Sequence, residues 1–448
     1  MILILRKLLL VIVLLAACGL ALAKQTDSSQ FDGKLTAVGA ESAANSDGSI
    51  PPWTGGMESG AAPIATNGDY GDPFASEQPL YVVSKANLSQ YQGLLSPGQV
   101  AMFARYPDYR MRVFPSHRSA AIPQAYLDES RKNLTQVNLA DNGNGLTGYQ
   151  FGVPFPQPTE ALEVLWNHLT RYRGGSIDRD FSSAIVQAKG DYTLTTYHQL
   201  VGFREKISDL KPEENLLYYA RVQTNSPSRY AGEVTLVQEP INQVATPRAA
   251  WQYNPGQRRA RRAPTVAYDT SARYSFGQVV ADSIDGFNGA PNRYEWKLLG
   301  KRELLVGYNA FALASKKISY DDLLKPGYLN PDFNRYEKHR VWVIEANLKP
   351  GARHVYGKRR FYIDEDTWQI MASDIYDTRG ELWRNYESYL TQYHDLLLPL
   401  TAAESTYDLI SGIYAVNYLT NGINQRAQFG KAIKKAVFTP AELKRLGK

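Results

Sequence analysis

The chain is poor in the residues that most often carry chemistry. Its 448 residues include one cysteine, Cys18, which excludes a disulfide framework and a cysteine metal site in the rest of the chain. None of the six histidines lies in an H-E-x-x-H motif or beside a partner at metal-ligand spacing. The G-x-S-x-G, P-loop and dinucleotide-binding motifs are absent as well. We therefore predict no catalytic residue, no metal and no cofactor, and we expect that the protein is not an enzyme.

Strong charge of one sign is also missing. The chain has 50 Lys and Arg against 44 Asp and Glu, and neither end carries a basic tail. Such a small excess argues against nucleic acid as a partner. After residue 23 no apolar run reaches 18 residues, so no spanning helix is expected in the body of the chain.

Residues 1–23 have the pattern of an export signal. Arg6 and Lys7 precede an apolar run over residues 8–15, and small residues follow. Two processing sites fit: Ala21-Leu22-Ala23 suits ordinary cleavage, and Leu15-Ala16-Ala17-Cys18 resembles a lipobox whose cysteine is lipidated. Both predict export into the periplasm of a Gram-negative bacterium. Lipidation of Cys18 would add an anchor on the outer membrane and peripheral contact with that membrane.

Tyrosine is unusually abundant, with 30 Tyr beside 15 Phe and 7 Trp. Aromatic residues favour half-buried strands, where the ring packs and a polar tip stays hydrated. Turn residues separate many short segments with this composition, and the short connections favour antiparallel pairing. The expected strands are 192–203, 215–224, 232–238, 249–253, 258–263, 293–299, 302–308, 339–348, 354–363, 367–376, 382–390 and two more between 405 and 419.

Helices are few. Ser96-Pro97-Gly98-Gln99 is a capping box that predicts a helix to about residue 105. Others are expected at 122–137, 160–171, 319–324 and after Thr439. The helix at 160–171 has an apolar stripe at 3.6-residue spacing: Ala161, Leu162, Leu165, Trp166 and Leu169. A sheet of more than a dozen strands must curl, split or close. We predict a mainly β (α+β) fold, with one large, strongly bent antiparallel sheet that forms a half-open β-barrel under a few covering helices. Residues 24–70 are expected to form an extended arm pinned by Trp53, and residues 71–448 a single domain.

Residues 248–270 predict a β-hairpin with unusual chemistry. Asn254-Pro255-Gly256-Gln257 is a turn signal, and Trp251 and Tyr253 point to the same side of the first strand. The second strand carries a dense arginine cluster: Arg258, Arg259, Arg261 and Arg262. Alternation divides these arginines between two faces, so one pair is expected to face the covered side of the sheet. Two interpretations remain open: ion pairs with carboxylates such as Asp269, Asp282, Asp285 or Glu295, or binding of an anionic group or a partner protein.

Other large aromatic residues also fall at strand positions. Packed core is the ordinary role for each of them. As a set they could instead form the wall of an apolar cavity, and the sequence leaves both roles open. The wall candidates are Trp251, Tyr253, Tyr268, Trp296 and Trp342.

Several motifs resemble the bacterial family of domain of unknown function 1329. They are V-G-A-E at 38–41, D-G-S-I-P-P-W-T-G-G at 47–56, Y-P-D-Y-R-M at 106–111, H-R-S-A at 117–120, W-N-H-L at 166–169, R-Y-R-G at 171–174, W-Q-Y-N-P-G-Q-R-R at 251–259, D-G-F-N-G-A-P at 285–291, W-K-L-L-G-K-R at 296–302, H-R-V-W-V at 339–343 and F-Y-I-D-E-D-T-W-Q-I at 361–370. The resemblance implies membership of the outer-membrane lipoprotein-sorting superfamily with LolA and LolB. That superfamily has a bent antiparallel sheet whose hydrophobic concavity holds acyl chains. Members are often encoded near a resistance-nodulation-division type exporter and an outer-membrane protein, which are the partners the resemblance implies. It supplies no catalytic residues.

We therefore expect a periplasmic carrier or chaperone that binds a hydrophobic or amphipathic molecule, such as a lipid, an acyl chain or a lipoprotein, in the concave face of the sheet. The alternative is an adaptor without cargo that docks on an exporter or an outer-membrane protein.

Overall fold

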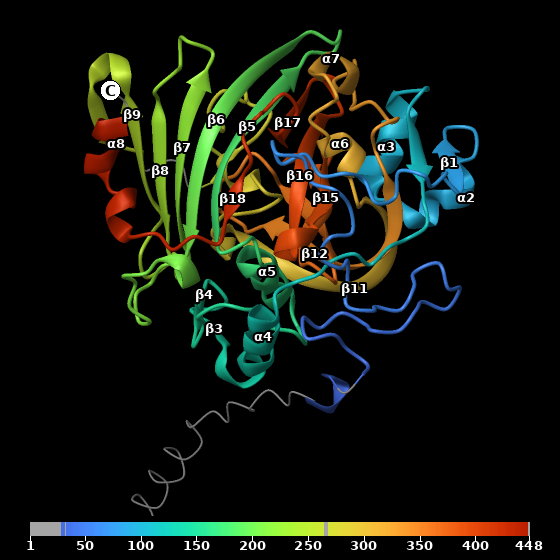
Figure 1. Ribbon diagram of the computed structural model, residues 1–448, viewed down its shortest axis with the longest axis horizontal. Coiled ribbons are helices and arrows are strands. Elements are labelled where there is room, and N and C mark those ends of the chain that lie inside the picture. Colours follow the sequence, from blue (N-terminus) through green and yellow to red (C-terminus); the bar gives the residue numbers. More distant parts are fainter. Residues whose placement is uncertain (1–27, 32, 264–267, 447–448) are drawn as a thin grey trace, which may run out of the picture.

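One large sheet dominates the structure (Figure 1). The computed structural model describes residues 28–31, 33–263 and 268–446. Sixteen strands belong to the sheet, in the order β1-β2-β12-β13-β14-β15-β16-β17-β5-β6-β7-β8-β9-β10, with β11 and β18 paired off this path. The predicted fold class, mainly β with a few helices, is confirmed. The sheet is mixed rather than antiparallel throughout, because β2 with β12 and β11 with β15 make parallel contacts.

The chain forms its strands in two groups. The first group is β1 (Tyr81–Ser84), β2 (Arg110–Val113), β3 (Asn138–Ala140), β4 (Gly145–Thr147), β5 (Ser176–Val186), β6 (Tyr192–Phe203), β7 (Tyr218–Ser226), β8 (Val234–Glu239), β9 (Ala249–Asn254) and β10 (Arg259–Arg262). The second is β11 (Tyr294–Gly307), β12 (Tyr336–Leu348), β13 (Lys358–Asp364), β14 (Ile370–Tyr376), β15 (Leu382–Tyr393), β16 (Leu398–Asp408), β17 (Tyr414–Leu419) and β18 (Gln428–Phe429). Strands β3 and β4 form a separate hairpin.

Strands β11 to β15 close into a partial ring. Each pairs with the next, and Gly307 of β11 then meets Tyr389 of β15. A Cβ atom at Gly307 would lie 2.5 Å from the ring of Tyr389, so this close approach requires glycine. A buried cluster with residues from all five strands packs within this group: Leu304, Val306, Tyr308, Val341, Val343, Tyr362, Met371, Ala372 and Leu390. This half of the sheet is therefore solid.

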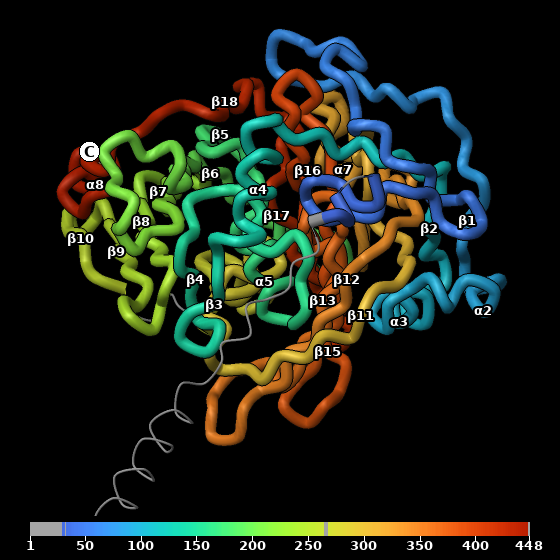
Figure 2. Tube along the Cα trace, turned by 90° about the horizontal axis from the view of Figure 1, so that it is seen from below, coloured from blue at the N-terminus to red at the C-terminus, as the bar shows by residue number. Residues whose placement is uncertain are grey.

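Strands β5 to β10 form the other half of the sheet, which continues from β17 and curves away from the ring (Figures 1 and 2). Helix α8 (Pro440–Leu446) packs on the outer face of β8, β9 and β10. The apolar residues beneath it include Leu236, Tyr253 and Phe438, all buried. The opposite, concave face of β5 to β9 has no helix of its own.

Six further α-helices lie in the described part of the chain. They are α2 (Leu88–Tyr91), α3 (Pro97–Arg105), α4 (Gln124–Gln136), α5 (Ala161–Thr170), α6 (Phe311–Ala314) and α7 (Tyr320–Leu323). The predicted capping box of α3 is confirmed: Ser96 Oγ accepts from the Gln99 amide at 3.2 Å, and the Gln99 side chain accepts from the Ser96 amide. Helix α5 ends where the chain turns into β5, and it packs on β11 and β12.

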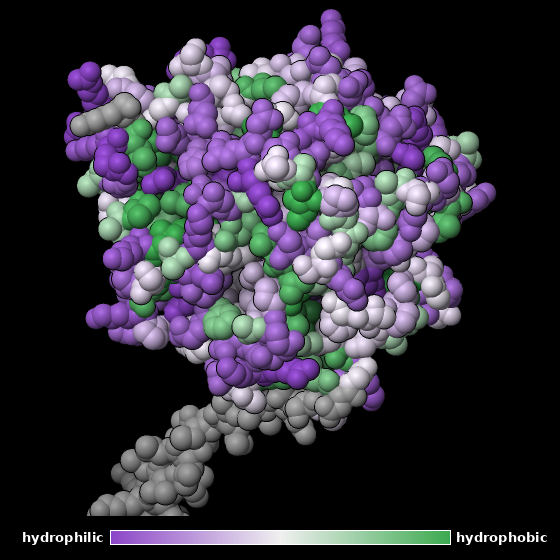
Figure 3. Space-filling view, in the orientation of Figure 1, coloured by the Kyte–Doolittle hydropathy of each residue, from purple (hydrophilic) through white to green (hydrophobic). Residues whose placement is uncertain are grey.

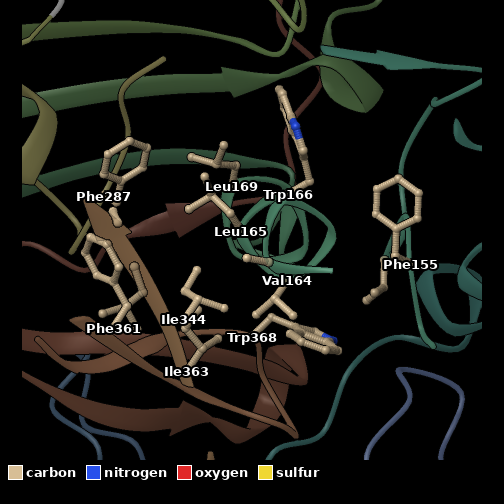
Figure 4. Packing of buried hydrophobic residues seen from close by; sticks show 14 of the residues in the cluster. Phe155, Val164, Leu165, Trp166, Leu169, Phe287, Ile344, Phe361, Ile363 and Trp368 are labelled. Carbon is tan, nitrogen blue, oxygen red and sulfur yellow. The ribbon is translucent and has the colours of Figure 1, made fainter. Parts of the chain in front are cut away.

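Helix α5 carries the predicted apolar stripe, with Leu165, Trp166 and Leu169 buried. Figure 4 shows side chains of α5 pointing toward the sheet residues Ile344, Ile363 and Trp368. The same cluster includes Leu217 and Ile241 next to β7 and β8. Helix α5 therefore joins the two halves of the sheet in one hydrophobic core.

The described part of the predicted arm, to residue 70, runs along the body with little regular structure. Val38, Ala40 and Ile50 are buried, and the Trp368 indole donates to the Val38 carbonyl at 3.0 Å. Trp53, the expected pin, is only half-buried. Smaller aliphatic side chains thus hold the arm.

The predicted strands differ from the structure in two ways: β1 to β5 and β18 were not predicted, and one strand was predicted as two. Strand β5 lies at the centre of the sheet but was not predicted, because Asp178, Arg179 and Asp180 interrupt its apolar pattern. The expected strands at 293–299 and 302–308 are one strand, β11, with a bulge between Leu298 and Gly300. Gly300 has φ 97°, which explains why a turn signal in the sequence is a bulge in the structure. In the described ranges, no helix is both long and apolar enough to cross a membrane.

Candidate functional site

A cleft of about 480 Å³ lies against the concave face of β5 to β9. Every second residue along the strands forms its floor, and residues of β16 and β17 form its inner end. The segment 268–288 covers it from the other side; this segment is drawn in yellow behind the green strands in Figure 1. The cleft is thus enclosed between a curved sheet and a loop that carries almost no regular structure.

Apolar and aromatic side chains form most of the cleft wall. Every second residue of each strand faces the cleft, as a strand requires. The strands supply Ile177, Phe181, Ile185, Tyr197, Val201, Phe203, Tyr218, Ala220, Val222 and Val237, and the remaining wall includes Val279, Ile284, Leu400 and Tyr418. The opposite parity packs outward, for example Leu236 and Tyr253 under α8.

The polar part of the cleft is strongly basic. Five arginines and one aspartate line it: Arg171, Arg173, Arg179, Arg248, Arg273 and Asp285. Asp285 accepts from Arg171, and it accepts from Arg173 Nη1 at 3.0 Å. Burial of Asp285 opposes its ionisation, but the two guanidinium groups prevail and lower its pKa. Asp285 is therefore a carboxylate fully occupied by two cations.

Two more arginines of the cleft have carboxylate partners behind the wall. Arg248 pairs with Glu239, and both side chains are buried. Arg273, on the covering segment, pairs with Glu233 through Nε at 2.7 Å. Tyr274 stacks on Tyr230 with ring centroids 4.0 Å apart. These last two contacts attach the covering segment to the connection between β7 and β8.

The first pair of predicted wall residues, Trp251 and Tyr253, does not line the cleft. They do point the same way, as predicted, but they lie on the outer face of β9 against the residues of α8. Gln252, the intervening residue, faces the cleft. Alternation gave the correct division of residues, but it could not tell which face α8 would cover.

The other three predicted wall residues lie in or beside the ring half. Trp296 stacks with Phe361, and its indole donates to the Pro291 carbonyl at 2.9 Å. Trp342 stacks with Trp368, and Arg293 lies over the ring of Tyr268. The alternative role of packed aromatics describes all three better than a cavity wall does.

The arginine hairpin forms, and its arginines are all exposed. Asn254 caps the turn over residues 255–257, and Arg258 has φ 48° there, so β10 begins only at Arg259. Within the described ranges no carboxylate forms an ion pair with Arg258, Arg259, Arg261 or Arg262. Arg262 lies over the Trp251 ring at 5.9 Å. Of the two interpretations, ion pairs with these carboxylates do not form among the described residues, and Asp282 and Asp285 pair with other arginines. Strand β10 is the edge of the sheet, so its arginines stay exposed even though α8 packs on its outer face.

One group of residues has a spacing that could hold a metal ion: His339, Asp364 and Asp366, all buried. Arg118 already occupies both oxygens of Asp366, at 2.6 and 2.9 Å. Burial and the neighbouring Asp366 raise the pKa of Asp364 to about 7. The guanidinium group bound to both oxygens of Asp366 opposes a cation there, so the group is best described as a structural charge network.

Cys18, the predicted lipidation site, lies outside the described residues.

Comparison with known proteins agrees with the sequence motifs. Residues 82–444 match the model of a family described as protein of unknown function, DUF1329. The chain belongs to this family. It is 45% identical over 437 residues to the Pseudomonas aeruginosa "uncharacterized protein PA3922", a match that covers 97% of this chain and 96% of the relative.

Solved structures with similar folds are distant in sequence. A DUF1329 family protein from Desulfovibrio piger is 13% identical, with 60% of this chain and 92% of that chain covered and a TM-score of 0.42. A putative outer membrane lipoprotein-sorting protein domain from Vibrio parahaemolyticus is 12% identical, with 64% and 98% covered and a TM-score of 0.43. The LolA superfamily protein NE2245 from Nitrosomonas europaea is 14% identical, with 63% and 98% covered and a TM-score of 0.38.

Proposed function

We propose that the protein binds a hydrophobic or amphipathic molecule in the cleft and acts as a carrier or chaperone in the periplasm. The cleft itself carries this proposal: it has an apolar wall, a volume of about 480 Å³ and a cover that is a separate chain segment. Ligand pockets of proteins typically measure about 300–1,000 Å³ and have this apolar character. The export pattern of residues 1–23 supports the location.

The energetics suit a carrier. Each methylene removed from water contributes about 0.8 kcal/mol, so a chain of about ten methylenes contributes on the order of 8 kcal/mol before ordering costs are subtracted. The net affinity would be useful but reversible, as transfer between envelope components requires. We propose binding rather than catalysis.

The direct test is mass spectrometry of the organic extract of protein purified from its native envelope without detergent. We expect co-purified amphiphiles, and we expect delipidated protein to bind a fluorescent fatty-acyl probe. Ala220→Trp places a large ring into the cleft and should abolish probe binding, whereas Gln223→Trp, on the opposite face of β7, should retain it. An empty extract together with no probe binding by the delipidated protein would refute the proposal.

A second function, docking on an exporter or an outer-membrane protein, has one observation in its favour. Strand β10 is a sheet edge with unpaired backbone groups, and its hairpin carries the four exposed arginines. A partner with an acidic edge would fit this surface. Replacing Arg259 and Arg261 by Glu should reduce capture of an envelope protein in a crosslinking experiment while leaving acyl-probe binding unchanged. Equal capture of the envelope protein by the wild type and by this variant would exclude the hairpin as the docking surface.

A further inference from the structure

Arg179 occupies an unusual position in the cleft. It lies on β5 and is 7% exposed, and its guanidinium group lies 5.5 Å from the centre of the Phe181 ring and 4.4 Å from that of Tyr418. Its Nε donates to Gln199 Oε1 at 2.9 Å. Two aromatic faces and a neutral amide therefore orient the group, and all of these residues line the cleft.

Arg179 is also the cleft arginine that lacks a carboxylate. Asp285 forms ion pairs with Arg171 and Arg173. Glu239 pairs with Arg248, and Glu233 pairs with Arg273. In the part of the chain that the structure describes, no carboxylate lies within 4.0 Å of the Arg179 guanidinium, and its two terminal amino groups donate no hydrogen bond.

The adjacent aspartates cannot supply the missing charge, because they face the other side of β5. There, Asp180 Oδ1 lies 2.9 Å from His198 Nδ1 and Asp178 Oδ1 lies 3.5 Å from His198 Nε2. Among the described residues, four of the five cleft arginines thus have a carboxylate partner and Arg179 has none. A buried cation without an anionic partner is costly, and a bound anion would remove that cost.

We infer that the natural ligand is an anionic amphiphile whose carboxylate or phosphate head group pairs with Arg179. This inference rests on the proposed function and specifies its ligand class. The planar guanidinium group can donate two parallel hydrogen bonds to either head group. The apolar side chains next to Arg179 on the same face of the sheet, Ile177, Phe181 and Val201 among them, would hold the chain of the amphiphile.

The test compares four probes with one hydrocarbon chain and different heads: hexadecanoate, hexadecyl phosphate, hexadecanol and hexadecyltrimethylammonium. Each is titrated into delipidated, full-length protein below the probe's micelle concentration. We expect at least one anion to bind about tenfold or more tightly than the alcohol and the cation, since a paired charge in a desolvated site contributes at least that factor. Whichever of hexadecanoate and hexadecyl phosphate binds more tightly identifies the preferred kind of lipid head group.

Arg179→Gln should remove the preference for the anion and leave alcohol binding nearly unchanged, whereas Arg179→Lys should retain part of it. Arg261→Gln, on the exposed hairpin, is the matched control and should behave as the wild type. Equal affinity of the wild type for the anions and the alcohol would overturn this inference while leaving the carrier function intact. Absence of binding by all four probes would overturn both. The affinities of the four probes for the wild-type protein test the inference even if Arg179→Gln does not fold.

Discussion

The pKa of a buried carboxylate in this protein depends on whether a guanidinium group or a neutral donor binds it. Arg359 and His354 surround Asp282, with contacts of 3.0 and 3.1 Å, and lower its pKa despite its burial. Glu404 is 2% exposed and accepts from the Tyr386 hydroxyl, at 2.9 Å, and from the Asn417 side-chain amide, at 3.0 Å. Burial and the nearby Asp285 raise its pKa to about 7. Each carboxylate therefore has its own dependence of stability on pH.

Glu404 should make the protein less stable as the pH rises. Its pKa is about 7 when folded against 4.5 for the ordinary group, so between these values the folded state binds a proton that the unfolded chain has released. The free energy of unfolding then falls as pH increases through this window, by on the order of 3 kcal/mol. Glu404→Gln, which cannot ionise, should lack this decrease when urea unfolding is measured at pH 5 and pH 8. Glu58→Gln, at an exposed position, is the control. The same pH dependence in wild type and Glu404→Gln would contradict the assignment.

The pair of Asp282 and Arg359 should show the cost of an isolated buried charge. Arg359 is 1% exposed, and both of its terminal nitrogens donate to Asp282 at 3.0 Å. Asp282→Ala leaves the guanidinium group unpaired and should lower the free energy of unfolding by about 3–5 kcal/mol. Adding Arg359→Met should recover part of this loss in the same denaturation experiment. A double variant less stable than the single one would show that the pair contributes by its packing and not by its charge.

At the scale of elements, the sequence predicted helices and strands with a regular pattern of apolar residues. It did not predict strands in which charged residues interrupt that pattern. The capping box of α3 and the stripe of α5 depend on neighbours in sequence, so the sequence predicted both. Strand β5 was missed because its charged residues are satisfied across strands, Asp180 by His198 and Arg179 by Gln199. A single arginine among Ile177, Phe181 and Ile185 on one face was the available signal for the site. The sequence could not show that this face would border a cleft, since this depends on a covering segment about a hundred residues away.

Residues 270–276 of that covering segment are attached through Arg273 and Tyr274 to the connection between β7 and β8, so they should be the part of the site that opens. Glu233→Gln removes the carboxylate that binds Arg273. We expect faster hydrogen exchange in residues 270–280 and faster release of an acyl probe. The global stability should change little, because Arg273 is partly exposed and such pairs contribute about 0–1 kcal/mol. Asp377→Asn, which removes an ion pair with Arg379 on a distant hairpin, should leave both rates unchanged. Unaltered exchange and release in Glu233→Gln would show that this segment is not the moving part.

At the scale of the whole molecule, one continuous sheet provides both a solid half and a hollow half. The ring of β11 to β15 fills with its own side chains, while β5 to β9 curve around a cleft. The surface facing the viewer in Figure 3 is mainly hydrophilic with scattered hydrophobic residues, and the large apolar clusters are buried. That the sheet has more than a dozen strands could be predicted from composition and turns, although β1 to β5 and β18 were missed. The division into a filled and a hollow half could not, because it follows from the single contact between Gly307 and Tyr389 and from the position of α8.

The two halves should nevertheless unfold together. Strand β17 pairs with β5 across the junction, and the α5 cluster contains Leu217 and Ile241 from one half and Ile344 from the other. Loss of either half would expose this shared core, so the free energy of unfolding one half alone approaches that of unfolding both. Pulse-labelled hydrogen exchange in urea should give the same unfolding midpoint for β7 and β13. Coincident midpoints are the test of a single transition. Leu165→Ala, in the shared cluster, should lower both midpoints together, with a cost of about 2–5 kcal/mol. Two separate midpoints would mean that α5 does not couple the halves, and that the cleft half can open while the ring stays folded.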